Sequence, residues 1–196
     1  MKGRARELGI LVVTFAASFV VAAIWFGDWK FGLGFVLLIL IHELGHVAEA
    51  RRQGLQVSLP TFIPLIGAYV TYRHSGLAPW RSGLISLAGP LAGGIAAAGV
   101  WAVGSERGSY WLLYLAYIGF LLNAANLLPV GILDGGAIFR GISATWQRPA
   151  IRYENGIPVE ASAPERSRAV QLAVAYGLLA AGLVACAIAT RHSGAF

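Results

Sequence analysis

The sequence predicts an all-α membrane protein, a polytopic bundle of about five transmembrane helices with a short membrane-associated β-hairpin or re-entrant strand. Of its 196 residues, 57% are hydrophobic and only 12% are charged, which lies outside the usual range for a soluble globular domain. Five apolar stretches also approach the roughly 20 residues that an α-helix needs to cross a bilayer. These stretches are about 8–26, 32–52, 83–104, 110–128 and 170–190.

The placement of basic residues predicts the orientation of these helices. A formal net charge of +6 could suggest a nucleic-acid partner, but the 15 Lys and Arg residues are unevenly placed. With a cytoplasmic N-terminus, Lys30, Arg107 and Arg191 lie outside and the other twelve lie inside. This asymmetry follows the positive-inside rule. We therefore expect a multi-pass protein of the cell membrane with its N-terminus in the cytoplasm, and no nucleic-acid binding.

The chain is expected to form one membrane-embedded domain, 1–196. Its first apolar stretch follows three basic residues, as in a secretory signal peptide, but the apolar run is too long, so we expect an uncleaved span. The connection 141–169 contains three prolines and is expected to be a loop, with a hairpin around Asn155 and Gly156 as an option. It is too short for an independently folding module.

The connection 53–82 is apolar without being helical. Its segment "VSLPTFIPLIGAYVTYR" carries Pro60, Pro64 and Gly67, and "AYVTY" is rich in β-formers. We expect a short hairpin or re-entrant strand against the membrane face. Irregular backbone survives at membrane depth only when it is buried in protein or lines a wet cavity, so this segment is expected to border the functional site.

Ionisable residues interrupt the second apolar stretch, in "ILIHELGHVAEARR". His42 and His46 are four residues apart and therefore project from one helix face, where both can reach one metal ion. In H-E-x-x-H sites the histidines bind zinc, and the glutamate, here Glu43, is the general base for a water activated by the metal. The alternative is that these side chains only make interhelical hydrogen bonds. Ionisable residues inside a membrane are costly, which favours the metal site.

A catalytic zinc ion needs a third protein ligand and an open fourth position. Glu49 is too far along the helix axis, His74 lies in the membrane-face loop, and His192 lies on the outer side. The best candidate is Asp134, in "NLLPVGILDGG", where Pro129 interrupts a helix and glycines allow tight backbone. The alternative for Asp134 is an N-cap of the following segment. The site would lie toward the cytoplasmic side, short of the midplane of the membrane.

Small and amide residues lie in the neighbouring stretches. Gly89 and Gly93, in "LAGPLAGGIAAAG", form a small-xxx-small pair that lets helix backbones approach closely, which is foremost a packing signal. Asn123 and Asn126 share one helix face. One of them could donate a hydrogen bond to a developing oxyanion or hold a substrate backbone, and interhelical bonding is the alternative for Asn123.

Taken together, "HELGH", "AGPLAGG" and "NLLPVGILDGG" resemble the three signatures of the site-2 protease family of intramembrane zinc metalloproteases. The resemblance covers about residues 35–140. It implies that His42, His46 and Asp134 bind one zinc ion, that Glu43 is the catalytic base, and that Asn126 is the asparagine of the family's N-x-x-P-x-P-x-x-D-G pattern.

The resemblance also implies a function, the hydrolysis of a peptide bond within or near the transmembrane segment of a partner protein. The expected substrate is a single-span membrane protein, cut in regulated proteolysis or in clearance of signal-peptide remnants. A separate regulatory or inhibitory membrane protein is a further candidate partner. Gly131 replaces the second proline of the pattern, and the PDZ and CBS modules of many relatives are not evident, so we expect a minimal core enzyme. The alternatives are a membrane metal transporter and a catalytically silent metal-binding scaffold.

Overall fold

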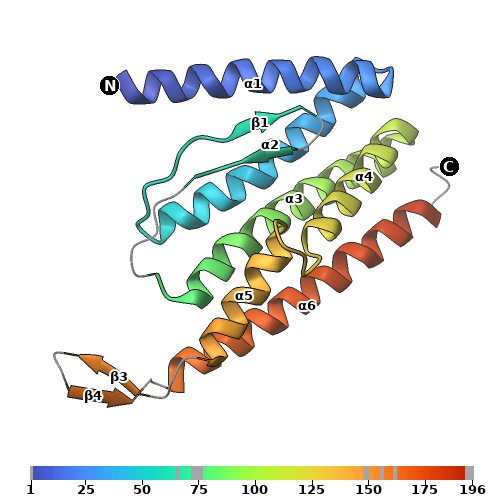
Figure 1. Ribbon diagram of the computed structural model, residues 1–196. Helices are drawn as coiled ribbons and strands as arrows, with labels where there is room; N and C mark the ends of the chain where they lie inside the picture. The colour runs from blue at the N-terminus through green and yellow to red at the C-terminus, as the bar shows by residue number, and fades with distance from the viewer. Residues whose placement is uncertain are drawn as a thin grey trace.

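The computed structural model describes residues 2–64, 67–71, 77–147, 151–154, 157–160 and 163–192 (Figure 1). Six helices and two small hairpins follow one another along the chain. Their bounds are α1 (Lys2–Phe26), α2 (Trp29–Arg52), β1 (Thr61–Ile63), β2 (Gly67–Tyr69), α3 (Pro79–Arg107), α4 (Tyr110–Asn126), α5 (Asp134–Gln147), β3 (Ile151–Glu154), β4 (Ile157–Glu160) and α6 (Ala163–His192). All five expected apolar stretches are helical, so the prediction of a helical membrane protein is confirmed.

Four helices are long and apolar enough to cross a membrane among the residues that the structure describes. They are Ala5–Phe26, Trp29–Arg52, Pro79–Arg107 and Arg166–Arg191. The helix α4 occupies the remaining expected stretch, but it has only 17 residues. At about 1.5 Å per residue it falls short of a hydrocarbon core about 30 Å thick. The expected count of five crossings is therefore not confirmed.

The helix α3 forms the centre of the bundle. It packs against α2, α4, α5 and α6, whereas α1 lies at the edge, against α2 and β1 (Figure 1). Small residues make this packing possible. A Cβ atom built at Gly45 of α2 would approach Cβ of Ala92 to 2.8 Å and would collide with the backbone of α3. The close contact between α2 and α3 therefore depends on a glycine inside the histidine motif.

The turn between α1 and α2 is set by local chemistry. Gly27 has φ of 68°, a left-handed conformation that suits glycine. Asp28 is the N-cap of α2, and its side chain accepts hydrogen bonds from the backbone N–H groups of Lys30 and Phe31. These two residues reverse the chain between the helices.

The first hairpin confirms the expected hairpin in the connection 53–82. Strands β1 and β2 are antiparallel, and Phe62 pairs with Ala68. The Phe62 side chain is buried and meets the Phe15 ring of α1 edge to face, with 5.4 Å between ring centroids. Its backbone N–H donates to Oγ1 of Thr14, also on α1. The hairpin is thereby fixed beneath the first helix.

The expectation of a loop over 141–169 is wrong at both ends. The helix α5 continues to Gln147, and α6 begins at Ala163. The optional hairpin is confirmed, because β3 and β4 are antiparallel and flank Asn155 and Gly156. Ile138 and Thr145 on one side of α5 are buried, so its 14 residues are stabilised by packing against α3 and α6.

Exposed aromatic side chains lie near both ends of the bundle. Trp25 and Trp29 flank the turn between α1 and α2, and Tyr110 and Trp111 begin α4 at the same end (Figure 1). Trp146 lies near the far end of α5. Tyr and Trp are enriched where membrane meets water, which agrees with a helical membrane protein.

Candidate metal centre

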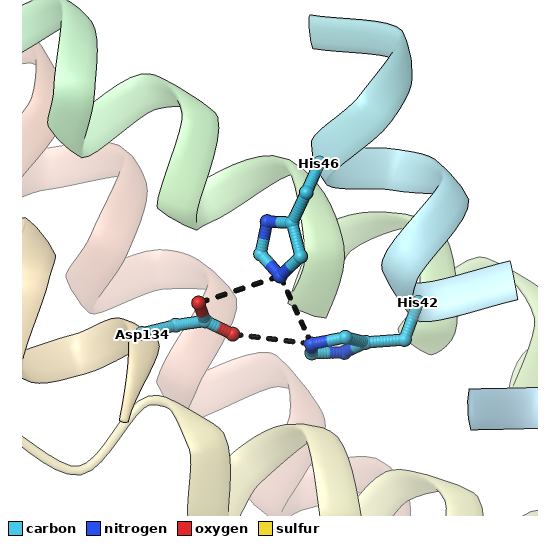
Figure 2. A group of neighbouring side chains, drawn as sticks. All are labelled: His42, His46 and Asp134. Carbon is cyan, nitrogen blue, oxygen red and sulfur yellow. Dashed lines mark hydrogen bonds and ion pairs between the residues drawn. The ribbon is translucent and has the colours of Figure 1, made fainter. Parts of the chain in front are cut away.

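The site joins one face of α2 to the first residue of α5 (Figure 2). His42 and His46 lie one helical turn apart and are buried, as is Glu43 between them. Asp134 begins α5 and points its carboxylate at both imidazoles (Figure 2). Asp134 lies inside α5, and Leu133 before it accepts the hydrogen bonds of Gly136 and Ala137, so the N-cap alternative does not hold.

The three side chains converge on one point. Nε2 of His42 lies 3.1 Å from Oδ2 of Asp134, and Nε2 of His46 lies 3.4 Å from Oδ1. The two Nε2 atoms are 3.1 Å apart. Ligands at about 2.0 to 2.1 Å in a tetrahedron are about 3.3 Å from one another. His42, His46 and Asp134 therefore have the spacing of three ligands of a tetrahedral zinc ion.

The protonation states of Asp134 and His46 are also compatible with binding a metal cation. Burial raises the pKa of Asp134, but the hydrogen bonds and charge of His42 and His46 outweigh burial and hold this pKa below its ordinary value. The side chain is then a carboxylate, the form that binds a metal. Nδ1 of His46 donates to the backbone oxygen of Ile85, 2.8 Å away, which leaves Nε2 facing the carboxylate. A divalent cation could replace the protons shared between these atoms.

The turn between α4 and α5, which is stabilised by side-chain hydrogen bonds, positions Asp134. Pro129 and Gly131 lie in the non-helical segment between α4 and α5. The hydroxyl of Tyr176 on α6 donates to the backbone oxygen of Leu127, and Nη1 of Arg140 donates to that of Gly131. A glycine stands where the family pattern has its second proline, and its carbonyl is held by an arginine of α5. Side-chain hydrogen bonds therefore support the turn.

The two glycines of α3 do more than bring helices together. A Cβ atom built at Gly89 would collide with the His46 ring and would lie 2.9 Å from Nε2 of His42. A Cβ atom built at Gly93 would collide with the side-chain amide of Asn123. The small-xxx-small pair thus makes room for the imidazoles and for the amide beside them. The expectation that this pair is foremost a packing signal was incomplete.

A cavity of about 670 Å³ opens beside the histidines. It lies between α1, α2 and the first hairpin, and Glu43 and Asn126 both line it. Apolar side chains such as Val36, Ile39 and Phe62 form much of its wall. The cavity is large enough for several residues of an extended peptide.

The structure brings together all five candidate site residues. His42, His46 and Asp134 form the cluster, and Glu43 and Asn126 face the same cavity. Glu49 accepts hydrogen bonds from Arg52 and Gln53 at the end of α2 and is not part of the cluster. His74 lies outside the described residues, and so does the side chain of His192.

Two contacts of the histidines were not found from the sequence. One is the backbone oxygen of Ile85, which no residue type could reveal. The other is Asn123, whose Oδ1 lies 2.8 Å from Nδ1 of His42. The sequence did show that Asn123 and Asn126 share one face of a helix. Periodicity along that helix could not show which residue of α2 lies opposite Asn123.

Comparison with known proteins identifies relatives of this chain. The sequence model of peptidase family M50 matches residues 30–109 and 105–157. Rip3 of Mycobacterium tuberculosis, provisionally named a zinc metalloprotease, is 31% identical over 174 residues, which cover 80% of this chain and 42% of Rip3. A zinc metalloprotease of Methanocaldococcus jannaschii is 28% identical over 144 residues, which cover 69% of this chain and 42% of that protein.

A third relative, provisionally named a zinc metalloprotease of Synechocystis, is 30% identical over 128 residues, which cover 61% of this chain and 33% of that protein. The chain thus spans about a third to two fifths of the length of these relatives. No solved structure gives a significant match. The family match extends over the histidine motif of α2, the glycines of α3 and the Asp134 turn, and on that ground the chain belongs to peptidase family M50, the site-2 protease family.

Proposed function

We propose that this protein is an intramembrane zinc endopeptidase that cuts a partner membrane protein within or near its transmembrane segment. The observation that carries the proposal is the convergence of His42, His46 and Asp134 beside a cavity that Glu43 also lines. A structural metal site is closed by four protein ligands, whereas a catalytic site has three and an open position. Three ligands bordering a cavity therefore favour catalysis.

The residues around the cluster have distinct roles in this proposal. Zinc held by the three ligands would act as a Lewis acid and lower the pKa of a water molecule to about 7. The Glu43 carboxylate accepts the proton of the attacking water and then passes it to the leaving nitrogen of the substrate. The side chain of Asn126 is the candidate donor to the developing oxyanion. Its Nδ2 donates to the backbone oxygen of Leu122 at 3.2 Å.

A helical substrate hides its backbone, so it must unwind before it can be cut. We propose that the unwound segment adds to the free edge of β2 as an extended strand. The strand β2 covers Gly67–Tyr69, and residues 72–76 lie outside the described part. Gly67, Ala68 and Tyr69 of β2 line the cavity, which supports a substrate at this edge.

The register of the hairpin indicates which residue of β2 faces a substrate. Opposite residues of an antiparallel pair direct their N–H and C=O groups either toward each other or both outward. The N–H of Phe62 points outward, because it donates to Thr14 of α1. Its partner Ala68 therefore also directs its N–H and C=O outward, away from β1.

Replacing Ala68 by proline would remove this outward donor and keep the hydrogen bonds within the hairpin. We expect Ala68→Pro to lower the rate of cleavage by about 2- to 12-fold, the equivalent of one net hydrogen bond of about 0.5 to 1.5 kcal/mol. Ala68→Ser keeps the N–H and is the matched control. If the proline variant binds zinc and cleaves as fast as Ala68→Ser, substrate does not add at this edge.

We propose that the N-terminus and the metal centre face the cytoplasm, as the distribution of basic residues indicates. The only cysteine, Cys186, can be replaced by serine. In that background we expect Lys30→Cys, in the first turn of α2, to react with a membrane-impermeant thiol reagent in intact cells. Arg52→Cys, at the other end of α2, should react only after the cells are opened. The reverse pattern would contradict the orientation.

Metal removal tests the proposed function as a whole. The full chain, reconstituted in liposomes with a single-span membrane protein, should contain about one zinc ion and should cleave the protein. A chelator should abolish cleavage and added zinc should restore it. A transporter would instead move zinc across the liposome membrane, and a silent scaffold would bind zinc without any cut. Either of those results would refute the proposed proteolysis.

A further inference from the structure

We propose that Asn123 is a positioning residue that fixes the tautomer and the ring orientation of His42, so that Nε2 is the atom presented to the metal. This inference rests on the proposed zinc site. A neutral imidazole carries one proton, and only the nitrogen without it can bind a metal. Whatever holds the other nitrogen therefore decides which one is available.

The direction of the hydrogen bonds follows from a backbone carbonyl. Nδ2 of Asn123 donates to the backbone oxygen of Gly119 at 2.7 Å, and that oxygen can only accept. The amide nitrogen of Asn123 must therefore face Gly119, and its Oδ1 must face His42. Since Oδ1 also can only accept, Nδ1 of His42 has to be the donor in their 2.8 Å contact. The proton is then on Nδ1, and Nε2 is left for the metal.

The hydrogen bonds of this buried amide prevent it from turning over. Asn123 has 0% of its surface exposed. Gly93 of α3 lies against the amide, and a Cβ atom there would collide with it. A flipped amide would place an N–H donor opposite Nδ1–H of His42 and a carbonyl oxygen opposite the carbonyl oxygen of Gly119, two repulsive contacts at a fully buried side chain. Only one orientation satisfies every group.

The neighbouring Asn126 is one helical turn away and differs in its surroundings. It lines the cavity and is less deeply buried than Asn123. Asn126 is therefore placed to meet substrate, whereas Asn123 is placed to meet a metal ligand. The two asparagines of α4 should give separable effects, one on the reaction and the other on metal binding.

The test compares zinc affinity among four variants of the full chain in detergent, measured by competition with a chelator. Asn123→Leu has a similar volume but no acceptor, and we expect its zinc affinity to fall about 10- to 100-fold. Asn123→Asp retains an acceptor oxygen and should lie closer to the parent. Asn126→Leu should bind zinc like the parent but cleave more slowly. Thr190→Val loses a buried hydroxyl of α6 and should change neither quantity.

Cobalt provides a second readout that does not depend on activity. The visible absorption of bound Co²⁺ reports the number and type of its ligands, so it should change in Asn123→Leu and should be recovered in Asn123→Asp. Thermal unfolding of the metal-free variants controls for loss of fold.

The possible outcomes separate this inference from the proposed function. If the parent binds zinc and cleaves, and Asn123→Leu binds zinc as tightly with an unchanged cobalt spectrum, Asn123 does not position His42. If Thr190→Val loses zinc as Asn123→Leu does, the effect is general loss of packing, and the inference is also wrong. If the parent itself binds no zinc, the proposed function fails together with the inference.

Discussion

Replacing Glu43 by glutamine should slow cleavage strongly while the protein still binds zinc. The two side chains have nearly the same size, so the buried position on α2 keeps its packing. An amide cannot accept the proton of an attacking water. General base catalysis contributes about 100- to 10,000-fold, and we expect the cleavage rate to fall by that factor. The measurement is the rate of cleavage of a membrane-embedded substrate, together with the zinc content of each purified protein.

The same helix provides a matched control. Glu49 is bonded to Arg52 and Gln53, outside the metal cluster, so Glu49→Gln should cleave at the parental rate. A Glu43→Gln variant that kept both zinc and full cleavage would eliminate Glu43 as the base. Loss of zinc from that variant would mean instead that the carboxylate helps to hold the metal.

A single methyl group at position 89 should also inactivate the protein. A Cβ atom at Gly89 would collide with the His46 ring, which is buried and is held at its other nitrogen by the Ile85 carbonyl. The ring must move, and a shift of about 1 Å in a catalytic group can cost about 100-fold in rate. We expect Gly89→Ala to lose zinc affinity and to cleave at least about 100-fold more slowly.

This effect should not arise from a weaker helix. Alanine favours a helix over glycine by about 1 kcal/mol, so α3 itself should not be destabilised. Gly99 lies in the same helix, and beyond its own helical backbone and chain neighbours no atom of the described residues lies within 4 Å of the position that its methyl group would take, which makes Gly99→Ala the control. We expect Gly99→Ala to bind zinc and cleave like the parent. Equal losses in both variants, measured beside their unfolding temperatures, would disprove the steric explanation.

Much of the site could be predicted because helix geometry is local. Residues four apart share a face in any α-helix, so His42 and His46 had to lie together once α2 formed. Asp134 was found because a carboxylate beside a proline-interrupted helix is rare in so apolar a chain. The helix α5 was not predicted, because its 14 residues are too few to cross a membrane and include three glycines, so they gave no signal of a transmembrane helix.

The sequence by itself determined the apolar helices, the pair of histidines on one helix face and the choice of Asp134 as their partner. Composition and periodicity decide the helices and the pair of histidines, because these features depend on residues close together in the chain. Asp134 could be chosen because few other acids lie near an apolar stretch. Only the tertiary structure decided that Asn123 meets His42 and that Gly89 and Gly93 leave room for the imidazoles and the amide. Such contacts depend on the rotation and depth of α2, α3 and α4 against one another. The packing of whole helices sets both, and spacing along one helix does not specify them.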